Sequence, residues 1–183
     1  MNFQIHSKLI RYGLILTAAG SAAVLGLILT DHLLPEILAS ELPKADKVVV
    51  KKSERKLLLL KDGEVLGEYG ISLGDAPVGH KRQEGDERTP EGEYVLDWRN
   101  EKSSFYKSIH VSYPNEEDKA AAAARGVSPG GLIMIHGQKN YFGWLWPLTQ
   151  GTDWTDGCIA VTNREMEEIW RSVENGTSIT IEP

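Results

Sequence analysis

An uncharged stretch near the N-terminus is the feature that most limits how this chain can fold. It runs for 19 residues from Tyr12 to Thr30, YGLILTAAGSAAVLGLILT, and follows Lys8 and Arg11. As a helix it would be about 28 Å long, which is close to the hydrocarbon thickness of a bilayer. Because the basic residues precede the stretch and Asp31 follows it, the positive-inside tendency predicts residues 1–11 in the cytoplasm and the rest of the chain on the other side of the membrane.

A cleaved signal peptide is the alternative interpretation of this stretch. Small residues that offer cleavage sites are Ala22, Ala23, Ala39 and Ser40. The stretch is longer than the usual apolar region of a signal peptide, about 7 to 15 residues, which favours an uncleaved membrane anchor. If the segment is cleaved, the protein is instead exported without an anchor. Residues 31–46 then form a linker in which Pro35 and Pro43 oppose a continuous helix.

The remaining residues, 47–183, are enough to bury one hydrophobic core and are predicted to form one domain. The formal net charge of −6 argues against nucleic acid as a partner. Short apolar and β-branched runs bounded by turn residues predict strands, and two segments with N-caps predict short helices at 115–125 and 162–173. The predicted strands cover 48–50, 56–61, 65–72, 94–98, 109–113, 132–135, 159–161 and 177–181. The fold class is therefore mainly β with short helices (α+β).

Two of the predicted strands carry the only cysteine and a histidine at their ends. His136 follows the run 132–135, and Cys158 precedes the run 159–161. If these strands lie side by side, the imidazole and the thiol meet, and the imidazole can take the thiol proton to give the nucleophilic thiolate. Gly157 allows close backbone approach, and the amides around Cys158 are possible donors to an oxyanion. The alternative is that the cysteine is a small buried hydrophobic residue.

The motifs around this pair resemble a known family. His136-Gly137 followed by Thr155-Asp156-Gly157-Cys158 resembles the signature of the L,D-transpeptidase catalytic domain (the YkuD-like family). The segment from Gly85 to Tyr94, GDERTPEGEY, is similar to the family's Thr-Pro-x-Gly-x-aromatic element. The resemblance covers residues 47–183 and implies a YkuD-like β-sandwich or mixed-sheet domain.

The resemblance also implies roles for individual residues. Cys158 would be the nucleophile and His136 its base, and the site would be shaped by Gly157 in the oxyanion turn together with Asp156 and Thr155. The cysteine would attack the carbonyl between an L-centre and a D-centre of a peptidoglycan stem peptide. A thioester acyl-enzyme would form and an amine acceptor would resolve it, with no cofactor.

Two other functions remain open. In the first, water is the acceptor, which gives an L,D-carboxypeptidase or an amidase that releases wall-attached protein. The second is a catalytically inert, membrane-tethered module that binds peptidoglycan. Two departures from the family pattern keep the outcome open: Asp156 stands where many members have histidine, and Ala160 where many have arginine or asparagine.

Several residues are candidates for contact with a substrate. The loop at 74–92 is long enough to line a cleft, and it offers Arg88 to a carboxylate. The resemblance implies that Tyr106 approaches the donor peptide. Trp144 and Trp146 can line a groove for an extended ligand, although packing in the core is the alternative.

A metal site is not predicted. Cys158, Asp156 and His136 supply three ligands, whereas structural zinc takes four, and the sequence has no CxxC or HExxH motif. No GxxxxGK[ST] or GxGxxG motif indicates a nucleotide. The sequence does not predict the oligomeric state.

Overall fold

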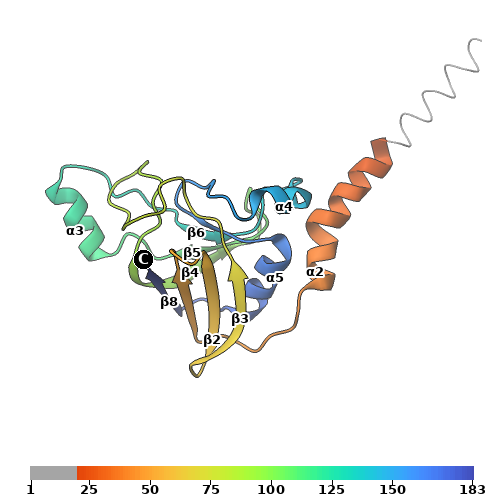
Figure 1. The fold of residues 1–183 in the computed structure, drawn as a ribbon, viewed down its shortest axis with the longest axis horizontal. Helices are drawn as coiled ribbons and strands as arrows, with labels where there is room; N and C mark the ends of the chain where they lie inside the picture. Colours follow the sequence, from red (N-terminus) through yellow and green to blue (C-terminus); the bar gives the residue numbers. More distant parts are fainter. Residues whose placement is uncertain (1–19) are drawn as a thin grey trace, which may run out of the picture.

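The computed structural model describes residues 20–183, and its body is one mixed sheet of eight strands (Figure 1). The strand order is β3-β2-β1-β8-β4-β5-β6-β7, with parallel pairing between β1 and β8 and between β6 and β7. The strands are β1 (Lys47–Lys51), β2 (Lys56–Lys61), β3 (Glu64–Gly70), β4 (Gly92–Asn100), β5 (Ser108–Val111), β6 (Met134–His136), β7 (Ile159–Ala160) and β8 (Thr177–Glu182). The prediction of a mainly β domain with a mixed sheet is confirmed.

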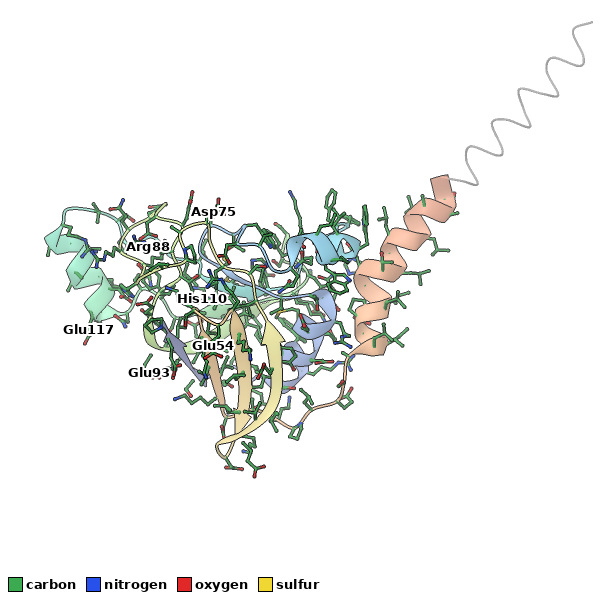
Figure 2. All side chains as sticks on the ribbon, viewed as in Figure 1. Glu54, Asp75, Arg88, Glu93, His110 and Glu117 are labelled. Carbon is green, nitrogen blue, oxygen red and sulfur yellow. The ribbon has the colours of Figure 1, made fainter. Side chains whose placement is uncertain are left out.

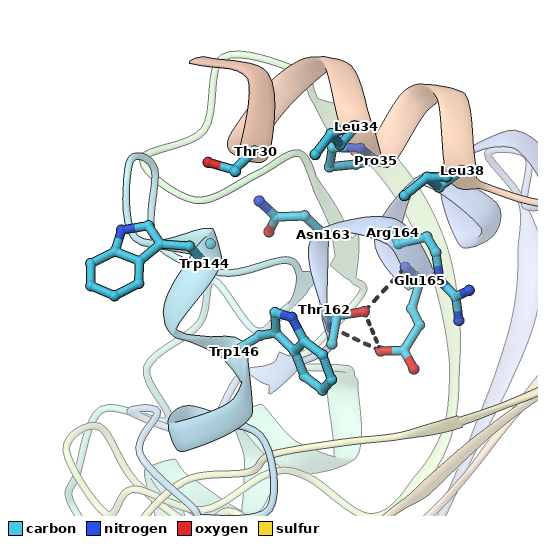
Figure 3. A pocket seen from close by; sticks show the side chains of 11 residues that line it. Thr30, Leu34, Pro35, Leu38, Trp144, Trp146, Thr162, Asn163, Arg164 and Glu165 are labelled. Carbon is cyan, nitrogen blue, oxygen red and sulfur yellow. Dashed lines mark hydrogen bonds between the residues drawn. The ribbon is translucent and has the colours of Figure 1, made fainter. Parts of the chain in front are cut away.

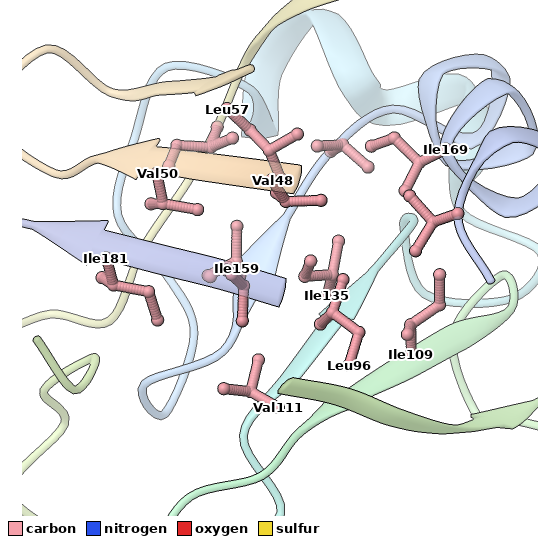
Figure 4. Packing of buried hydrophobic residues seen from close by; sticks show 14 of the residues in the cluster. Val48, Val50, Leu57, Leu96, Ile109, Val111, Ile135, Ile159, Ile169 and Ile181 are labelled. Carbon is pink, nitrogen blue, oxygen red and sulfur yellow. The ribbon is translucent and has the colours of Figure 1, made fainter. Parts of the chain in front are cut away.

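The two edges of the sheet meet, so the sheet curls into a half-barrel. Ser72, which follows edge strand β3, pairs with Ala160 of edge strand β7. The amide of each residue donates to the carbonyl of the other at 2.9 Å. The aliphatic core lies inside this curl, where Val48, Ile135 and Ile159 are fully buried (Figure 4). Closure therefore brings the segment after β3 against the strand that follows Cys158.

The helices of the body are α3 (Glu116–Ala124), η2 (Gly143–Leu145), α4 (Trp146–Thr149) and α5 (Asn163–Ser172). Both predicted N-caps are present, because the side chain of Asn115 accepts from the amide of Asp118 and that of Thr162 accepts from the amide of Glu165. Each pair forms a reciprocal capping box. Met166 and Ile169 of α5 are fully buried, so this helix covers one side of the core.

A helix from Gly20 to Leu38 leaves the body at one side (Figure 1). It contains a π-helical segment, η1 (Leu29–Leu33), and ends in α2 (Leu34–Leu38). By length and composition it can cross a membrane. The predicted cytoplasmic residues 1–11 and the first part of the predicted span, 12–19, lie outside the described residues.

The expectation that Pro35 opposes a continuous helix is wrong. Pro35 lies just after the wider π turn η1, whose altered hydrogen-bond pattern accommodates a residue without an N–H group inside the continuous helix. The helix is also held from outside, since the Arg171 guanidinium donates to the carbonyl of Glu36 at 2.6 Å. Tertiary contact therefore extends the helix to Leu38, into the predicted linker.

Candidate active site

The predicted pairing of the two strands that carry His136 and Cys158 is confirmed. β6 and β7 are parallel neighbours, with Ile135 opposite Ile159 and His136 opposite Ala160. Cys158 directly precedes β7. Because side chains alternate along a strand, Cys158 and His136 belong to the same face of this strand pair, while Ile135 and Ile159 face the core.

His136 is a buried, neutral imidazole with a defined tautomer. Its ring packs against Phe105 and Trp154, with ring centroids 4.2 Å and 5.9 Å away. Its Nδ1 lies 2.6 Å from the carbonyl oxygen of Gly137. A carbonyl only accepts, so Nδ1 carries the hydrogen and Nε2 keeps the lone pair. Burial lowers the pKa of His136 to about 4, against the opposing effect of the Gly137 carbonyl. The ring is therefore a free base near neutral pH.

Cys158 is partly exposed, and its thiol donates to the carbonyl oxygen of Leu132 at 3.6 Å. Burial is the main cause that raises the pKa of Cys158, and the charge of Asp156 raises it further. A backbone hydrogen bond from Met134 and the charge of Lys81 act in the opposite direction. With a raised cysteine pKa and a lowered histidine pKa, the resting pair is a thiol beside a neutral imidazole.

The turn before Cys158 is fixed by its own side chains. The Thr155 hydroxyl donates to the carbonyl of Cys158 at 2.8 Å and accepts from the amide of Gly157 at 3.2 Å. Gly157 has φ +109°, and a Cβ there would lie 2.5 Å from the carbonyl oxygen of Arg88, so only glycine fits. Asp156 points outward and is exposed. Within residues 20–183 the amide of Cys158 makes no backbone hydrogen bond, which leaves it open to a ligand.

Thr89 connects the upstream motif to this turn. Its hydroxyl donates to the carbonyl of Gly157 at 2.9 Å, and the side chain is completely buried. Sequence reasoning singled out the Thr-Pro motif but not this contact, nor the carbonyl of Gly137 that orients the base. The Thr-Pro motif was the only sequence feature that indicated a role for Thr89. A contact with a backbone carbonyl, such as that of Gly137, cannot be recognised from any residue type.

The other predicted contact residues lie in three different environments. Arg88 is partly exposed beside the turn, among the loops at the same end of the sheet as Asp75 (Figure 2). Within residues 20–183 its guanidinium has no hydrogen-bond or ion-pair partner. Tyr106 is buried, and its hydroxyl donates to Glu167 at 2.9 Å. The Tyr106 carbonyl accepts from the amide of Gly137 at 3.0 Å, so this residue supports the segment that orients the base.

Trp144 and Trp146 face the N-terminal helix. They line a cavity of about 590 Å³ with residues of that helix and with the start of α5 (Figure 3). Neither Cys158 nor His136 lines this cavity. The structure therefore does not bring the two tryptophans together with the cysteine and histidine. Among the described residues, no group of three or more His, Cys, Asp or Glu side chains is arranged to hold a metal ion.

A half-barrel with a cysteine and a buried basic histidine at neighbouring strand ends has the parts that acyl transfer through a thiol requires. The family model described as L,D-transpeptidase catalytic domain matches residues 45–181, and the chain belongs to this family. It is 31% identical over 132 residues to a protein of Escherichia coli K12 named putative L,D-transpeptidase YafK. That alignment covers 69% of this chain and 46% of the relative, so the chain spans about half the length of the curated relative it matches.

Solved structures show the same fold. The helical cell shape determining protein Pgp2 from Campylobacter jejuni is 25% identical with a TM-score of 0.57, over 74% of this chain and 46% of that one. An L,D-transpeptidase from Xylanimonas cellulosilytica is 17% identical with a TM-score of 0.50, over 76% of this chain and 61% of that one. The second likeness concerns the fold alone.

Proposed function

We propose that this protein is a membrane-anchored, cysteine-dependent L,D-transpeptidase that acts on peptidoglycan stem peptides. The observation that carries the proposal is the fixed tautomer of His136. Its Nδ1 is held by the carbonyl of Gly137 and its Nε2 is unprotonated, on the strand next to Cys158. A cysteine adjacent to an oriented base is the arrangement that activates a thiol for attack on a carbonyl. Family membership supplies the substrate class.

The first half of the reaction forms a thioester. The sulfur of Cys158 attacks the carbonyl carbon of an L-centre to D-centre peptide bond while its proton passes to Nε2 of His136. The tetrahedral oxyanion accepts from the amide of Cys158, whose N–H group is not used by the backbone of the described residues. The C–N bond then breaks, and the amine of the D-residue leaves with the proton from His136.

The second half transfers the acyl group. An acceptor amine gives a proton to Nε2 of His136 and attacks the thioester carbon. The C–S bond breaks, and the sulfur regains the proton from His136. Because the resting pair is neutral, we expect proton transfer to accompany attack instead of preceding it. In this scheme Thr155 and Gly157 hold the turn, and Arg88, which is partly exposed, is the side chain that we propose to meet a substrate carboxylate.

The anchor is part of the proposal. The helix from Gly20 to Leu38 is long and apolar enough to span a membrane, and its last turns are bonded to the body. The amide of Gly143 donates to the carboxylate of Asp31 at 2.9 Å. Cleavage at Ala39 or Ser40 would remove these contacts, which argues against those two sites. In the proposal the helix is retained and the catalytic domain lies on the periplasmic side.

The test is product analysis by mass spectrometry. The full chain in detergent micelles is incubated with tetrapeptide muropeptides and a D-amino acid, and Cys158→Ala and His136→Asn serve as controls. Exchange of the terminal D-residue that is lost in both variants supports the proposal. Tripeptide without exchange would instead identify a hydrolase, and binding without turnover would identify an inert module. A carbapenem should add its mass to the wild-type chain and leave Cys158→Ala unmodified.

A further inference from the structure

The loop between the two site strands exposes large apolar side chains that the body does not bury. Large apolar side chains are most often buried in a soluble domain, yet here half or more of each is exposed. The exposed fractions are 58% for Tyr141, 50% for Phe142, 53% for Trp144, 50% for Trp146 and 75% for Leu148. No charged residue occurs between Lys139 and Asp153. An uncharged apolar surface of this kind marks a site of interaction.

The position of this loop along the N-terminal helix is fixed by hydrogen bonds. Asp31 is 1% exposed, and its carboxylate accepts from the amide of Gly143 in the loop. The side chain of Asn163 donates to the carbonyl of Asp31 at 3.3 Å. Figure 1 shows α4, which follows Gly143, beside the helix. The loop is therefore attached at the level of Asp31.

The surroundings of the N-terminal helix change at the level of Asp31. On the N-terminal side of Thr30 the helix presents apolar side chains with nothing against them, among them Val24 and Leu25 at 57% exposed. At Asp31 the helix gains its first charged residue after Arg11 and begins to bond to the body, although Ile37 and Leu38 stay exposed at 73% and 58%. If the helix spans a bilayer, the boundary between hydrocarbon and water lies near Thr30 and Asp31. At a rise of about 1.5 Å per residue, the loop lies within about one turn of that boundary.

We propose that the segment from Tyr141 to Leu148, which we call the aromatic loop, inserts into the outer interface of the lipid bilayer beside the anchoring helix. The proposal rests on the membrane anchor of the proposed function. Tryptophan and tyrosine concentrate where hydrocarbon meets headgroups, because their rings are apolar and each carries one polar group. Phe142 and Leu148, 50% and 75% exposed, add apolar area to the same loop.

A lipid surface fits this loop better than a glycan or peptide does. A sugar chain needs hydrogen-bonding side chains around its aromatic platform, and the exposed members of the aromatic loop supply one hydroxyl and two indole N–H groups. Leu148, the most exposed of them, offers no polar atom. The absence of charge from the loop also matches the low cost of placing it at the bilayer boundary.

Insertion would act on the site through the ends of the loop. The Thr149 hydroxyl donates to the side chain of Gln138 at 2.6 Å, and the Gln138 side chain donates to the carbonyl of Val161 at 2.9 Å. These residues flank His136 on β6 and Cys158 before β7. The aromatic loop and the site are thus one connected unit, so docking would hold the site at a constant height above the membrane.

The test uses the full chain in liposomes, with tryptophan fluorescence as the readout and phospholipids brominated near the headgroup as the quencher. Trp144→Phe/Trp146→Phe removes the two indoles and keeps the rings apolar. Trp98→Phe is the matched control, because Trp98 is 38% exposed but stacks on His110 of β5. Quenching should fall at least about twofold in the double variant and stay unchanged in the control.

Flotation of the liposomes distinguishes failure of the membrane anchor from failure of the aromatic loop to insert. A chain that floats with the lipid but is quenched equally in the wild type and the double variant keeps its anchor and overturns docking. A chain that does not float overturns both the anchor and this inference. Quenching that soluble muropeptides abolish in the floating chain would also overturn it, because the aromatic loop would then be a glycan site.

Discussion

The low pKa of His136 makes a prediction about stability against pH. Burial against Phe105 and Trp154 lowers this pKa from 6.5 to about 4 in the folded chain, whereas the unfolded chain keeps the ordinary value. Between those two values the unfolded chain binds a proton that the folded chain does not. The stability contributed by the neutral ring is therefore present above about pH 6.5 and is lost as the pH falls toward about 4.

The size of the effect follows from the two pKa values. The difference of about 2.5 between the unfolded and folded pKa values corresponds to about 3 kcal/mol once the ring has titrated in both states. Acidification from about pH 7 to about pH 5 should lower the unfolding free energy by about 2 kcal/mol. The assay is urea unfolding of the full chain in micelles, followed by tryptophan fluorescence at both pH values. Other titrating groups contribute to the same measurement, so the quantity of interest is a difference between two proteins.

His136→Asn isolates the contribution of the ring. Asparagine does not titrate, and its side-chain amide can still donate toward the carbonyl of Gly137. The variant should lose about 2 kcal/mol less than the wild type over the same acidification. Equal losses in the two proteins would refute the assignment of the low pKa to His136. The acid limb of the acylation rate should likewise fall near pH 4 instead of near 6.5.

Three further predictions concern single contacts around the site. Thr89→Val leaves the carbonyl of Gly157 without its donor and should lower the unfolding free energy by about 1 to 3 kcal/mol. Thr89→Ser keeps the hydroxyl and should lose less. Equal losses in the two variants would mean that the hydroxyl does not contribute to stability. Burial raises the pKa of Cys158, and the negative charge of Asp156 raises it further. Asp156→Asn removes that charge, so alkylation of Cys158 by iodoacetamide at neutral pH should become faster. A slower reaction would contradict this effect of Asp156. Asn163→Ala removes the oxygen that accepts from the buried backbone amide of Gln138, 2.8 Å away, so the unfolding free energy should fall by about 1 to 3 kcal/mol and hydrogen exchange at Gln138 should become faster. Arg164→Ala, at an exposed neighbour, should change neither quantity. An Asn163→Ala chain that stays stable with slow exchange would show that another group accepts this amide.

Features that depend on neighbours in sequence were predictable. Asn115 and Thr162 both cap their helices as expected, because the cap and its partner are three residues apart. Asp62 and Gly63, between β2 and β3, adopt φ of 52° and 83°, which is the left-handed geometry that an Asp-Gly hairpin turn requires. The strand pair carrying His136 and Cys158 was also predictable, since each residue ends a short apolar run.

Features that depend on residues far apart in sequence were not predictable. Thr89 and Gly157 are 68 positions apart, and no local pattern states that a hydroxyl of one meets a carbonyl of the other. The bond of Tyr106 to Glu167, 61 positions away, likewise holds this residue inside the body, and no local pattern indicates it. The helix beyond Thr30 was missed because propensity counts Pro35 as a breaker, whereas contact with Arg171 of α5 decides the outcome.

One residue connects the N-terminal helix to the proposed catalytic pair. Asn163 begins α5 directly after the cap Thr162, and its side chain bonds in two directions. Its oxygen accepts from the amide of Gln138, two residues after His136, and its nitrogen donates to the carbonyl of Asp31 in the N-terminal helix. The same buried amide therefore bonds both to the segment after His136 and to the N-terminal helix. A change that tilts the helix should strain these two bonds, which links the proposed membrane-facing side of the domain to the proposed reactive site.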